Sequence, residues 1–311
     1  MADSYILGID CGGTKVMAQS VTYNSITGLV SPGEFQLEVN YSDSPKWNSK
    51  FIPVHLDLQR QEFSEGNIYL TQPEIDQGNV IVETIQNIIS KSESDSIGLC
   101  FPGIKNERGV VIMANGPRIP DFLERIQGID SIPHDSDCCV LGEWKSTIGK
   151  LKNCYNAVYI GGGTGIADGI ILKGKMIDFN ARDDVKRSWE LKIPSGETIE
   201  SCLSPKWMIH QWNISQREKV ETLDQLSQNQ IANTIFEKAT EAFSFLIQNR
   251  TQFFKANHAK IEKIVIGQRL GIFMADSQLI SLLESNTDIQ LNYSTDRRTA
   301  ALGAAWKKSC S

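Results

Sequence analysis

Two stretches of the chain, half a chain apart, combine apolar runs with a glycine turn. The β-type run Tyr5 to Ile9 ends in Asp10, and the turn CGGT then leads to a second apolar run from Lys15 to Val21. Two such runs around a short glycine turn are typical of a β-hairpin. The run Asn156 to Ile160 enters the turn GGGTG and returns through IADGIILKGKM in the same way. This recurrence predicts a duplicated architecture.

Helical and strand-like segments alternate along the rest of the chain. Thr71-Gln72-Pro73-Glu74 has the form of a capping box and precedes isoleucines at helical spacing. Apolar runs bounded by turn residues predict strands at Ser96 to Phe101, Gly109 to Met113 and Ile261 to Ile266. Further helices are expected at Ser136 to Lys150, Thr198 to Trp212, Asn229 to Phe254 and Arg298 to Lys308. The alternation predicts the α/β class.

Two segments fit neither pattern. Asn40 to Asn67 is polar, contains two prolines and holds one strand-like run, FIPVHLDL, which suggests an insertion or an edge hairpin. Met176 to Pro194 is similarly unpatterned. Connections of this length inside a compact domain are usually functional, or they are secondary structure that the pattern has misread.

Length and composition narrow the class of protein. The 311 residues suggest two domains, and the net charge of -6 disfavours binding to nucleic acid. No apolar run reaches the roughly 20 residues of a membrane span, and the opening residues lack a signal-peptide pattern, so a cytoplasmic location is expected. Seven scattered cysteines without a CxxC pair indicate reduced thiols and no structural zinc.

The glycine turns have a chemistry of their own. Unshielded backbone N–H groups can cradle a phosphate, and glycine permits the positive φ that aims successive amides at one point. Thr14 and Thr164 add hydroxyl donors, Lys15 adds a charge, and Asp10 can hold Mg²⁺ through water. The alternative is a hairpin that uses glycine only for geometry. Because the turn recurs, we favour a nucleoside triphosphate held between two opposed turns.

Five motifs carry a family resemblance. GIDCGGTK at Gly8 to Lys15 and GTGIADG at Gly163 to Gly169 resemble the phosphate motifs of the sugar kinase, hexokinase and actin-like ATPase superfamily, and more narrowly those of the ROK sugar kinases. PGIKNERGVVIMAN, HDSDCCVLGE and TAALGAAW resemble the connecting segment, the catalytic-aspartate segment and the closing helix of that family. The resemblance implies a duplicated, two-lobed actin-like ATPase fold of the ribonuclease H-like type.

The resemblance also implies roles for individual residues. Asp135 falls where the family keeps its general base, although a helix N-cap is the alternative, for which Ser136 and Asp137 compete. ATP and its phosphates would be bound by Asp10, Gly12, Gly13, Thr14, Lys15, Gly163, Thr164, Gly165 and Gly267. The sugar would be bound by Asn115, His134, Glu190 and Glu200, and for Glu190 a solvated loop glutamate is an equal alternative.

The implied activity is phosphorylation of a sugar hydroxyl with ATP and Mg²⁺, glucokinase-like, on a hexose or an amino sugar. The small lobe would comprise residues 1–117 and 300–311, and the large lobe residues 118–299. A homodimer is expected from the family, and no partner of nucleic acid or membrane. ROK repressors carry a DNA-binding helix pair ahead of the first strand, and only four residues precede Tyr5 here, so we expect no such role unless a partner supplies the DNA contact.

The chain departs from the family pattern around the sugar and the nucleotide. His134 and Asp137 replace two asparagines, and the segment Trp189 to Ile193 keeps at most the Glu of the Glu-x-Gly-His sugar motif. The cysteine-rich zinc loop is absent, and Gln268 follows Gly267 where a second glycine is expected. These changes leave an alternative, a degenerate ROK protein that binds sugar or nucleotide without turnover. A further alternative is an ATPase or activator from another branch of the superfamily. Such a protein would need a cysteine pattern that ligates an iron–sulfur cluster, which the seven scattered cysteines do not offer.

Overall fold

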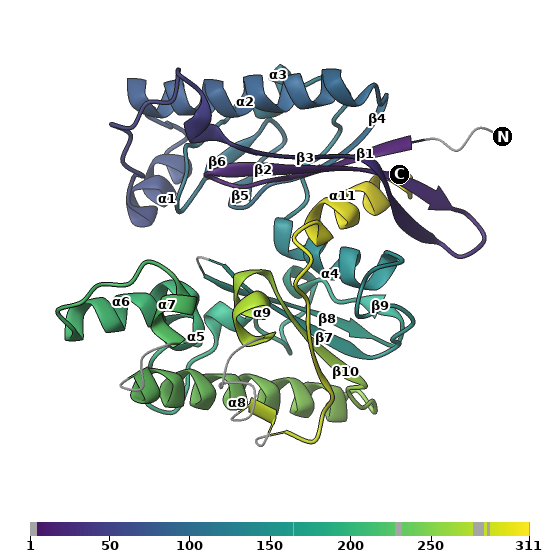
Figure 1. Cartoon of the computed structure of the whole chain (residues 1–311), viewed down its shortest axis with the longest axis vertical. Coiled ribbons are helices and arrows are strands. Elements are labelled where there is room, and N and C mark those ends of the chain that lie inside the picture. Colours follow the sequence, from purple (N-terminus) through teal and green to yellow (C-terminus); the bar gives the residue numbers. More distant parts are fainter. Residues whose placement is uncertain (1–4, 164, 228–231, 276–282, 285–286, 311) are drawn as a thin grey trace. The chain divides into compact units, whose positions relative to one another are not determined.

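The computed structural model describes the chain except for residues 1–4, 164, 228–231, 276–282, 285–286 and 311. Two compact units divide it (Figure 1). Unit 1 comprises Met1–Gly149 and Arg298–Ser311, and unit 2 comprises Lys150–Arg297. In the described part of the chain, no helix combines the length and the apolar character that crossing a membrane requires.

A four-stranded sheet forms the centre of unit 1, in the order β3-β2-β1-β4. Its strands are β1 (Tyr5–Cys11), β2 (Lys15–Asn24), β3 (Leu29–Asn40) and β4 (Ser96–Cys100). β1 runs antiparallel to β2 and parallel to β4. The first predicted hairpin and the strand predicted at Ser96 are therefore confirmed.

Helices cover both faces of this sheet. α2 (Gln72–Ser92) places Ile81 and Ile85 in one core with Leu7 and Ile9 of β1. α11 (Thr299–Ser309) packs on the other face in a cluster formed by Ile6, Val21, Val30, Leu302 and Ala305. Figure 1 shows α2 and α11 on opposite sides of the sheet. The odd and even residues of β1 thus serve two cores, as the alternation of a pleated strand requires.

Shorter elements complete unit 1. They are η1 (Tyr41–Asp43), α1 (Leu56–Ser64), β5 (Ile104–Lys105), β6 (Val110–Ile112), α3 (Phe122–Arg125) and α4 (Asp135–Lys145). The strand-like reading of FIPVHLDL is wrong, because its last residues begin helix α1. His55 lies at the N-cap of that helix, and its ring accepts a hydrogen bond from the N–H of Asp57 (3.4 Å). α4 begins one residue before the predicted start and ends at Lys145 rather than at Lys150.

Unit 2 repeats the arrangement of unit 1. Its sheet has the order β11-β10-β7-β8-β9. The strands are β7 (Ala157–Gly162), β8 (Ile166–Leu172), β9 (Lys175–Met176), β10 (Lys263–Gly267) and β11 (Leu291–Tyr293). β7 is antiparallel to β8 and parallel to β10, as β1 is to β2 and β4. The predicted duplication is confirmed at the level of strand pairing.

The helices of unit 2 are α5 (Glu200–Leu203), α6 (Pro205–Ser215), α7 (Leu223–Ser227), α8 (Asn233–Ala256) and α9 (Gln268–Ala275), with 3-10 turns η2 (Phe179–Ala181) and η3 (Ser188–Glu190). The single helix predicted at Thr198 to Trp212 is two helices. Ser204 interrupts it, because its side chain caps α6 and Pro205 occupies the first turn. α8 lies along one face of the sheet (Figure 1), and the first residues predicted for it fall outside the described part of the chain.

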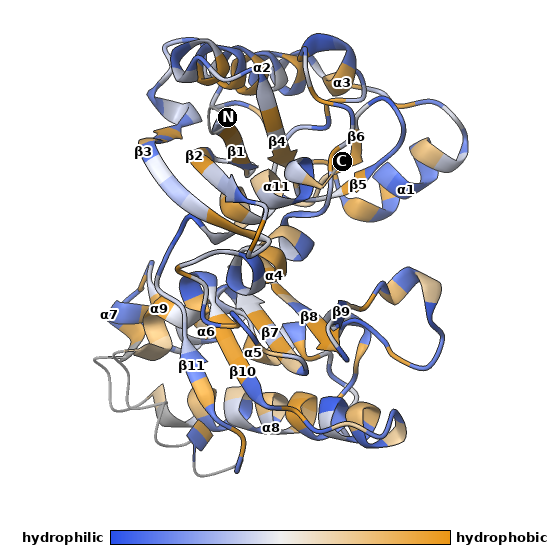
Figure 2. Ribbon diagram, turned by 90° about the vertical axis from the view of Figure 1, so that its right-hand side faces the viewer, coloured by the Kyte–Doolittle hydropathy of each residue, from blue (hydrophilic) through white to orange (hydrophobic). Residues whose placement is uncertain are grey.

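The buried strands of both units are the most apolar segments. Figure 2 shows β7, β8 and β10 mostly in orange, whereas the edge strand β3 is pale over much of its length. The burial of β3 agrees with this, since half-buried and exposed residues alternate from Glu34 to Asn40. Such a half-solvated edge strand gives a weak apolar signal, and the sequence did not predict it.

Residues 118–149 pack with unit 1. Helix α4 crosses α11 so closely that a Cβ on Gly142 would lie 1.8 Å from the carbonyl oxygen of Thr299. The predicted lobes place these residues with the second domain, following the order of the motifs. The boundary between functional lobes stays a prediction, while compactness groups α4 with the sheet of unit 1.

Candidate active site

The first glycine turn lies at the carboxyl end of β1. Asp10, half-buried, pairs with Met17 across the hairpin and with Cys100 of the parallel strand β4. The N–H of Gly12 donates to the carbonyl of Lys15 (2.9 Å) and closes the turn. A Cβ on Gly13 would lie 2.5 Å from the carbonyl oxygen of Asn115. Neither glycine has a positive φ. Gly13 is therefore required by close approach of another segment, not by the backbone angle that the sequence suggested.

Asp135 reaches the same end of the sheet from a different segment. After β4, Phe101 forms a parallel bridge with His134, and its N–H donates to Pro133 (3.2 Å). Asp135 is then the first residue of α4, and its Oδ1 accepts a hydrogen bond from the N–H of Ser136 (2.9 Å). The N-cap position belongs to His134, whose side chain makes no capping bond. The role of N-cap considered for Asp135 is thus not the one it has.

The two carboxylates influence each other. Burial, and then the neighbouring carboxylate of Asp135, raise the pKa of Asp10 to about 7, while a hydrogen bond from the Cys100 thiol to Asp10 Oδ1 (3.6 Å) opposes the shift. Burial also raises the pKa of Asp135, against the Lys105 ammonium and the Ser136 N–H, both of which lower it. Paired carboxylates of this kind are frequent at functional sites.

Lys105 is a residue that the sequence reading missed. Its Nζ lies 2.9 Å from the carbonyl oxygen of Gly103 and 3.0 Å from Nδ1 of His134. Burial lowers the pKa of Lys105 to about 8, although the charge of Asp135 works in the opposite direction. In the sequence, Lys105 is simply a lysine within the connecting segment PGIKNERGVVIMAN, and no motif position marks it. His134, predicted to bind sugar, thus contacts an ammonium group.

Lys15 and Asn115 differ in how far their side chains are engaged. Nζ of Lys15 lies 3.0 Å from Oε1 of Glu38 on β3, and both side chains are 30% exposed. Asn115 is exposed, and its backbone contacts the turn at Gly13. Unit 1 therefore brings together Asp10, Gly12, Gly13, Asn115 and the segment carrying Asp135, with the charge of Lys15 paired to a carboxylate.

The second glycine turn lies between β7 and β8 in unit 2. The N–H of Gly163 donates to the carbonyl of Gly165 (3.0 Å), and Thr164 lies outside the described residues. The N–H of Ile166 donates to Oε2 of Glu200 (3.1 Å). A Cβ on Gly165 would lie 2.3 Å from the same oxygen. Glu200, predicted from the family pattern, is thus in contact with the turn.

Gln268 follows β10 and lies beside the same turn. It forms a parallel bridge with Gly162, and its φ is +58°, a conformation that favours glycine. Its Oε1 is 3.2 Å from where a Cβ of Gly161 would lie. Gly267 has no room for a side chain, because a Cβ there would lie 2.6 Å from the hydroxyl of Tyr159. The departure from a second glycine therefore places a carboxamide next to the turn.

Glu190 is exposed and satisfies a local need. Its Oε2 accepts a hydrogen bond from the N–H of Arg187 (2.8 Å), within the 3-10 turn η3. Among the described residues, its carboxylate has this hydrogen bond with Arg187 and none with the glycine turn. This geometry agrees with the solvated loop glutamate that the sequence left open, and a role in sugar binding stays a prediction.

The carboxylate oxygens of Asp10 and Asp135 suit a hard cation such as Mg²⁺ better than a soft one. Within the part of the chain that the structure describes, no three His, Cys, Asp or Glu side chains gather as a metal-binding group. Mg²⁺ keeps several waters and is commonly held by one or two carboxylates together with phosphate oxygens. Asp10, with Asp135 near it, fits such a water-mediated ion.

No protein-family model and no curated sequence matches the chain. Solved structures do match. The ROK hexokinase from Thermus thermophilus has 17% identity and a TM-score of 0.63, with 97% of each chain covered. The ROK family glucokinase from Streptomyces griseus, in complex with glucose and AMPPNP, has 14% identity and a TM-score of 0.60, covering 97% of this chain and 98% of that one.

A ROK family transcriptional regulator, a homologue of the E. coli MLC protein, matches with 13% identity and a TM-score of 0.61, over 99% of this chain and 78% of the regulator. The same fold thus occurs in kinases and in a regulator. These matches confirm the resemblance drawn from the five motifs at the level of the fold. The chain has the duplicated, two-lobed α/β fold of the ROK proteins.

Proposed function

We propose that this protein phosphorylates a hydroxyl of a small sugar with ATP, and that Asp135 is the general base. The observation that carries the proposal is the meeting of Asp10 and Asp135 at the carboxyl ends of β1 and β4, beside the glycine turn. In open α/β sheets, ligands bind at this end of parallel strands. The shared fold with sugar kinases supports the same activity.

The chemistry asked of each residue is simple. Asp135 accepts the proton of the sugar hydroxyl while that oxygen forms a bond to the γ-phosphorus, and the bond between this phosphorus and the β,γ-bridging oxygen breaks to release ADP. In this proposal the turn lies against the phosphates and the N–H of Gly13 donates to them, since the N–H of Gly12 is engaged by the carbonyl of Lys15. Asn115 and Glu200 are the residues assigned to orient the sugar. Mg²⁺, when bound near Asp10, would neutralise phosphate charge.

In this proposal, the molecule that accepts the phosphoryl group is a hexose or an amino sugar. A polar pocket distinguishes such a molecule from water by carboxylate and amide groups that contact vicinal hydroxyls. Asn115 and Glu200 supply these two groups. His134, whose Nδ1 lies 3.0 Å from Nζ of Lys105, is a third residue assigned to the sugar in this proposal.

A second candidate is a ROK protein that binds sugar or nucleotide without turnover. Two observations favour it: the charge of Lys15 is paired to Glu38, and Gln268 places a side chain beside the second turn. Both features would weaken the hold on a triphosphate. The regulator among the structural matches is consistent with such a member of the fold.

The decisive experiment measures sugar-phosphate formation by the purified protein with ATP, Mg²⁺ and a panel of hexoses, amino sugars and their derivatives. Asp135→Asn should lower kcat by about 10²- to 10⁴-fold, because general-base catalysis contributes this much. Nucleotide binding, measured by calorimetry, should remain. Asp130→Asn is the matched control, since Asp130 is an exposed aspartate of the same unit that pairs with Lys308.

The outcomes separate the two candidates. Full activity in the Asp135 variant would refute the assignment of the base. Absence of turnover on every sugar by the unaltered protein, together with measurable sugar or nucleotide binding, would establish the binding protein instead.

A further inference from the structure

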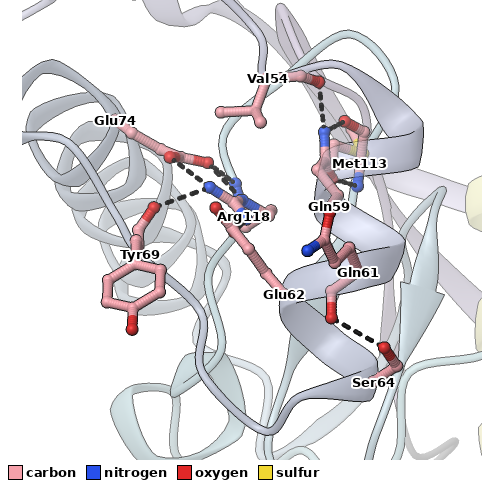
Figure 3. A network of polar contacts seen from close by, with 9 residues as sticks. All are labelled: Val54, Gln59, Gln61, Glu62, Ser64, Tyr69, Glu74, Met113 and Arg118. Atoms are coloured by element: carbon pink, nitrogen blue, oxygen red, sulfur yellow. Dashed lines mark hydrogen bonds and ion pairs between the residues drawn. The ribbon is translucent and has the colours of Figure 1, made fainter.

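The segment from Met113 to Arg118 carries Asn115 and is held at both ends by buried side chains. Figure 3 shows Gln59 of α1 with Met113 at one end, and Arg118 with Glu62 and Glu74 at the other. Gln59 and Glu62 come from within the segment 40–67, which follows neither the helical nor the strand pattern in the sequence. Glu74 comes from the first turn of α2.

The side chain of Gln59 forms hydrogen bonds with both the N–H and the carbonyl group of Met113. Its Oε1 accepts a hydrogen bond from the N–H of Met113 (2.8 Å), and its Nε2 donates to the carbonyl of the same residue (2.9 Å). Nε2 also donates to the carbonyl of Val54 (2.7 Å). Gln59 is 1% exposed, so water does not replace these bonds readily. Met113 is thereby fixed in position relative to α1.

Arg118 holds the other end of the segment. Its guanidinium donates to both oxygens of Glu74 (2.9 and 3.0 Å), to the carbonyl of Tyr69 (2.9 Å), and to Glu62. Its own N–H donates to Oε1 of Glu74 (3.0 Å). The side chain of Arg118 is fully buried, and a buried charge requires all its partners. The end of the segment is thus tied to α1 and α2 together.

The residues between these two ends contact the first glycine turn. A Cβ on Gly13 would lie 2.5 Å from the carbonyl oxygen of Asn115 and 3.3 Å from Cα of Gly116. Backbone packed this closely cannot shift toward the turn without a clash. The position of Asn115 is therefore determined by the turn on one side and by the two anchored ends on the other.

From this arrangement we infer that α1 is a positioning element of the sugar site, and that Gln59 is its central positioning residue. In this inference Gln59 does not contact the sugar itself. It acts through Met113, which holds Asn115 against the first glycine turn. The inference rests on the proposed function for the identity of the ligand. It gives the unpatterned segment 40–67 a role, because α1 within it holds the loop that carries Asn115 through Met113.

The test compares Gln59→Met with Gln61→Ala. Methionine keeps the volume of the buried side chain and removes its hydrogen bonds, whereas Gln61 lies on the same helix, is exposed, and bonds Glu65. Arg118 is unsuitable, because its removal leaves buried carboxylates unpaired and threatens folding. Amide hydrogen exchange of residues 113–118 is measured first, since it needs no activity.

In Gln59→Met, exchange within residues 113–118 should rise by about tenfold or more, as expected for the loss of buried hydrogen bonds. The KM for the sugar should rise by about tenfold, and the KM for ATP and kcat should change by less than about threefold. Gln61→Ala should match the unaltered protein in every measurement. If Gln59→Met fails to fold, Gln59→Glu, which keeps the acceptor for Met113, takes its place with the same expected direction.

Unchanged exchange at residues 113–118 would overturn the inference whether or not the protein is active. A rise in exchange throughout unit 1, with equal increases in both KM values, would also overturn it and indicate a merely structural role. If the unaltered protein phosphorylates no sugar, the proposed function fails alone, and exchange together with sugar binding by calorimetry still decides the role of Gln59.

Discussion

Lys105 places an ammonium group beside the carboxylate proposed as the general base. Asp135 responds to opposing influences: burial and the charge of Asp137 raise its pKa, while Lys105 and the N–H of Ser136 lower it. Asp10 adds a further carboxylate to the same cluster. Lys105 is the cation that opposes burial and the neighbouring carboxylates. Without its charge, the pKa of Asp135 would rise further, and the carboxyl group would keep its proton to a higher pH.

This balance predicts a pH effect. Asp135 works as a base only when ionised, so kcat/KM should fall as the pH drops through its pKa, and this acid limb should lie above the usual range of a free aspartate. In Lys105→Met the limb should move to higher pH by about one unit or more, because a neighbouring opposite charge lowers a carboxyl pKa by 1–3 units. The pH profile of kcat/KM measures it.

Two variants serve as controls for the pH profile. Lys105→Arg retains the charge and should leave the acid limb near its original position, and Lys46→Met removes an exposed lysine paired with Glu83. A limb that stays in place when Lys105 loses its charge would show that this ammonium does not influence the base.

The residues of the site were predictable where a motif marks them and unpredictable where only packing does. Asp10, Asp135 and Glu200 follow from motif positions, and each lies beside a glycine turn or at the sheet end. Lys105 and Gln59 carry no motif, and their importance comes from burial, which a single sequence does not reveal. Gly13 was singled out for its backbone angle, whereas the observed reason is the backbone of Asn115 next to it.

At the scale of elements, α11 is held by glycines. A Cβ on Gly8 of β1 would lie 2.0 Å from the carbonyl of Ala301, and one on Gly98 of β4 would lie 2.2 Å from that of Ala304. On its other side, a Cβ on Gly303 would lie 1.9 Å from the carbonyl of Cys138 in α4. α11 therefore packs against the sheet and against α4 at backbone distance, which only glycine allows.

Substitutions of helical glycines should separate close approach from helix propensity. Gly142→Ala in α4 should destabilise the protein by about 1–3 kcal/mol or more, because the added methyl group meets the backbone of Thr299. Gly78→Ala in α2 should be neutral or stabilising by up to about 1 kcal/mol, since its nearest neighbour is a side-chain atom of Ile119 at 3.4 Å.

Urea unfolding of both glycine variants gives these values. Equal effects at the two positions would contradict the close packing of α4 on α11, because helix propensity alone favours alanine at both.

The elements with strong periodicity were predictable, and those defined by a neighbour were not. The isoleucine spacing of α2 and the apolar runs of β1 and β7 gave the right elements because their burial follows the pattern. α1 was misread, since a few apolar residues after two prolines suit a strand as well as a helix. The break between α5 and α6 depends on capping by Ser204, which a continuous apolar pattern conceals.

Each unit has hydrophobic cores of its own. Among the residues that the structure describes, the large buried cluster of unit 2 draws its members from unit 2, and the two clusters of unit 1 draw theirs from unit 1. The sequence predicted this duplication from two recurring glycine turns. It placed residues 118–149 with the large lobe, an assignment that stays a prediction, because motif order carries no information about which sheet α4 packs on.

Because each unit has its own core, a core substitution in one unit should reduce the protection of amides against hydrogen exchange in that unit alone. Leu302→Ala should remove about 2–5 kcal/mol, the usual cost of truncating a buried leucine, and increase amide exchange in β1, β2 and β4 while β7 and β10 stay protected. Leu246→Ala, at a fully buried leucine of unit 2, should give the reverse pattern. Equal loss in both units for either variant would show that the chain unfolds as one cooperative body.

The return of α11 to unit 1 sets an order of events during synthesis. β1 to β4 leave the ribosome early, but the sheet face formed by Ile6, Val21 and Val30 stays uncovered until Leu302 and Ala305 follow. All of Lys150–Arg297 must be translated in between, which takes roughly 7 to 30 s at the usual rates of synthesis. Unit 2 can complete its core first, so the N-terminal unit is the one that a chaperone would meet unfinished.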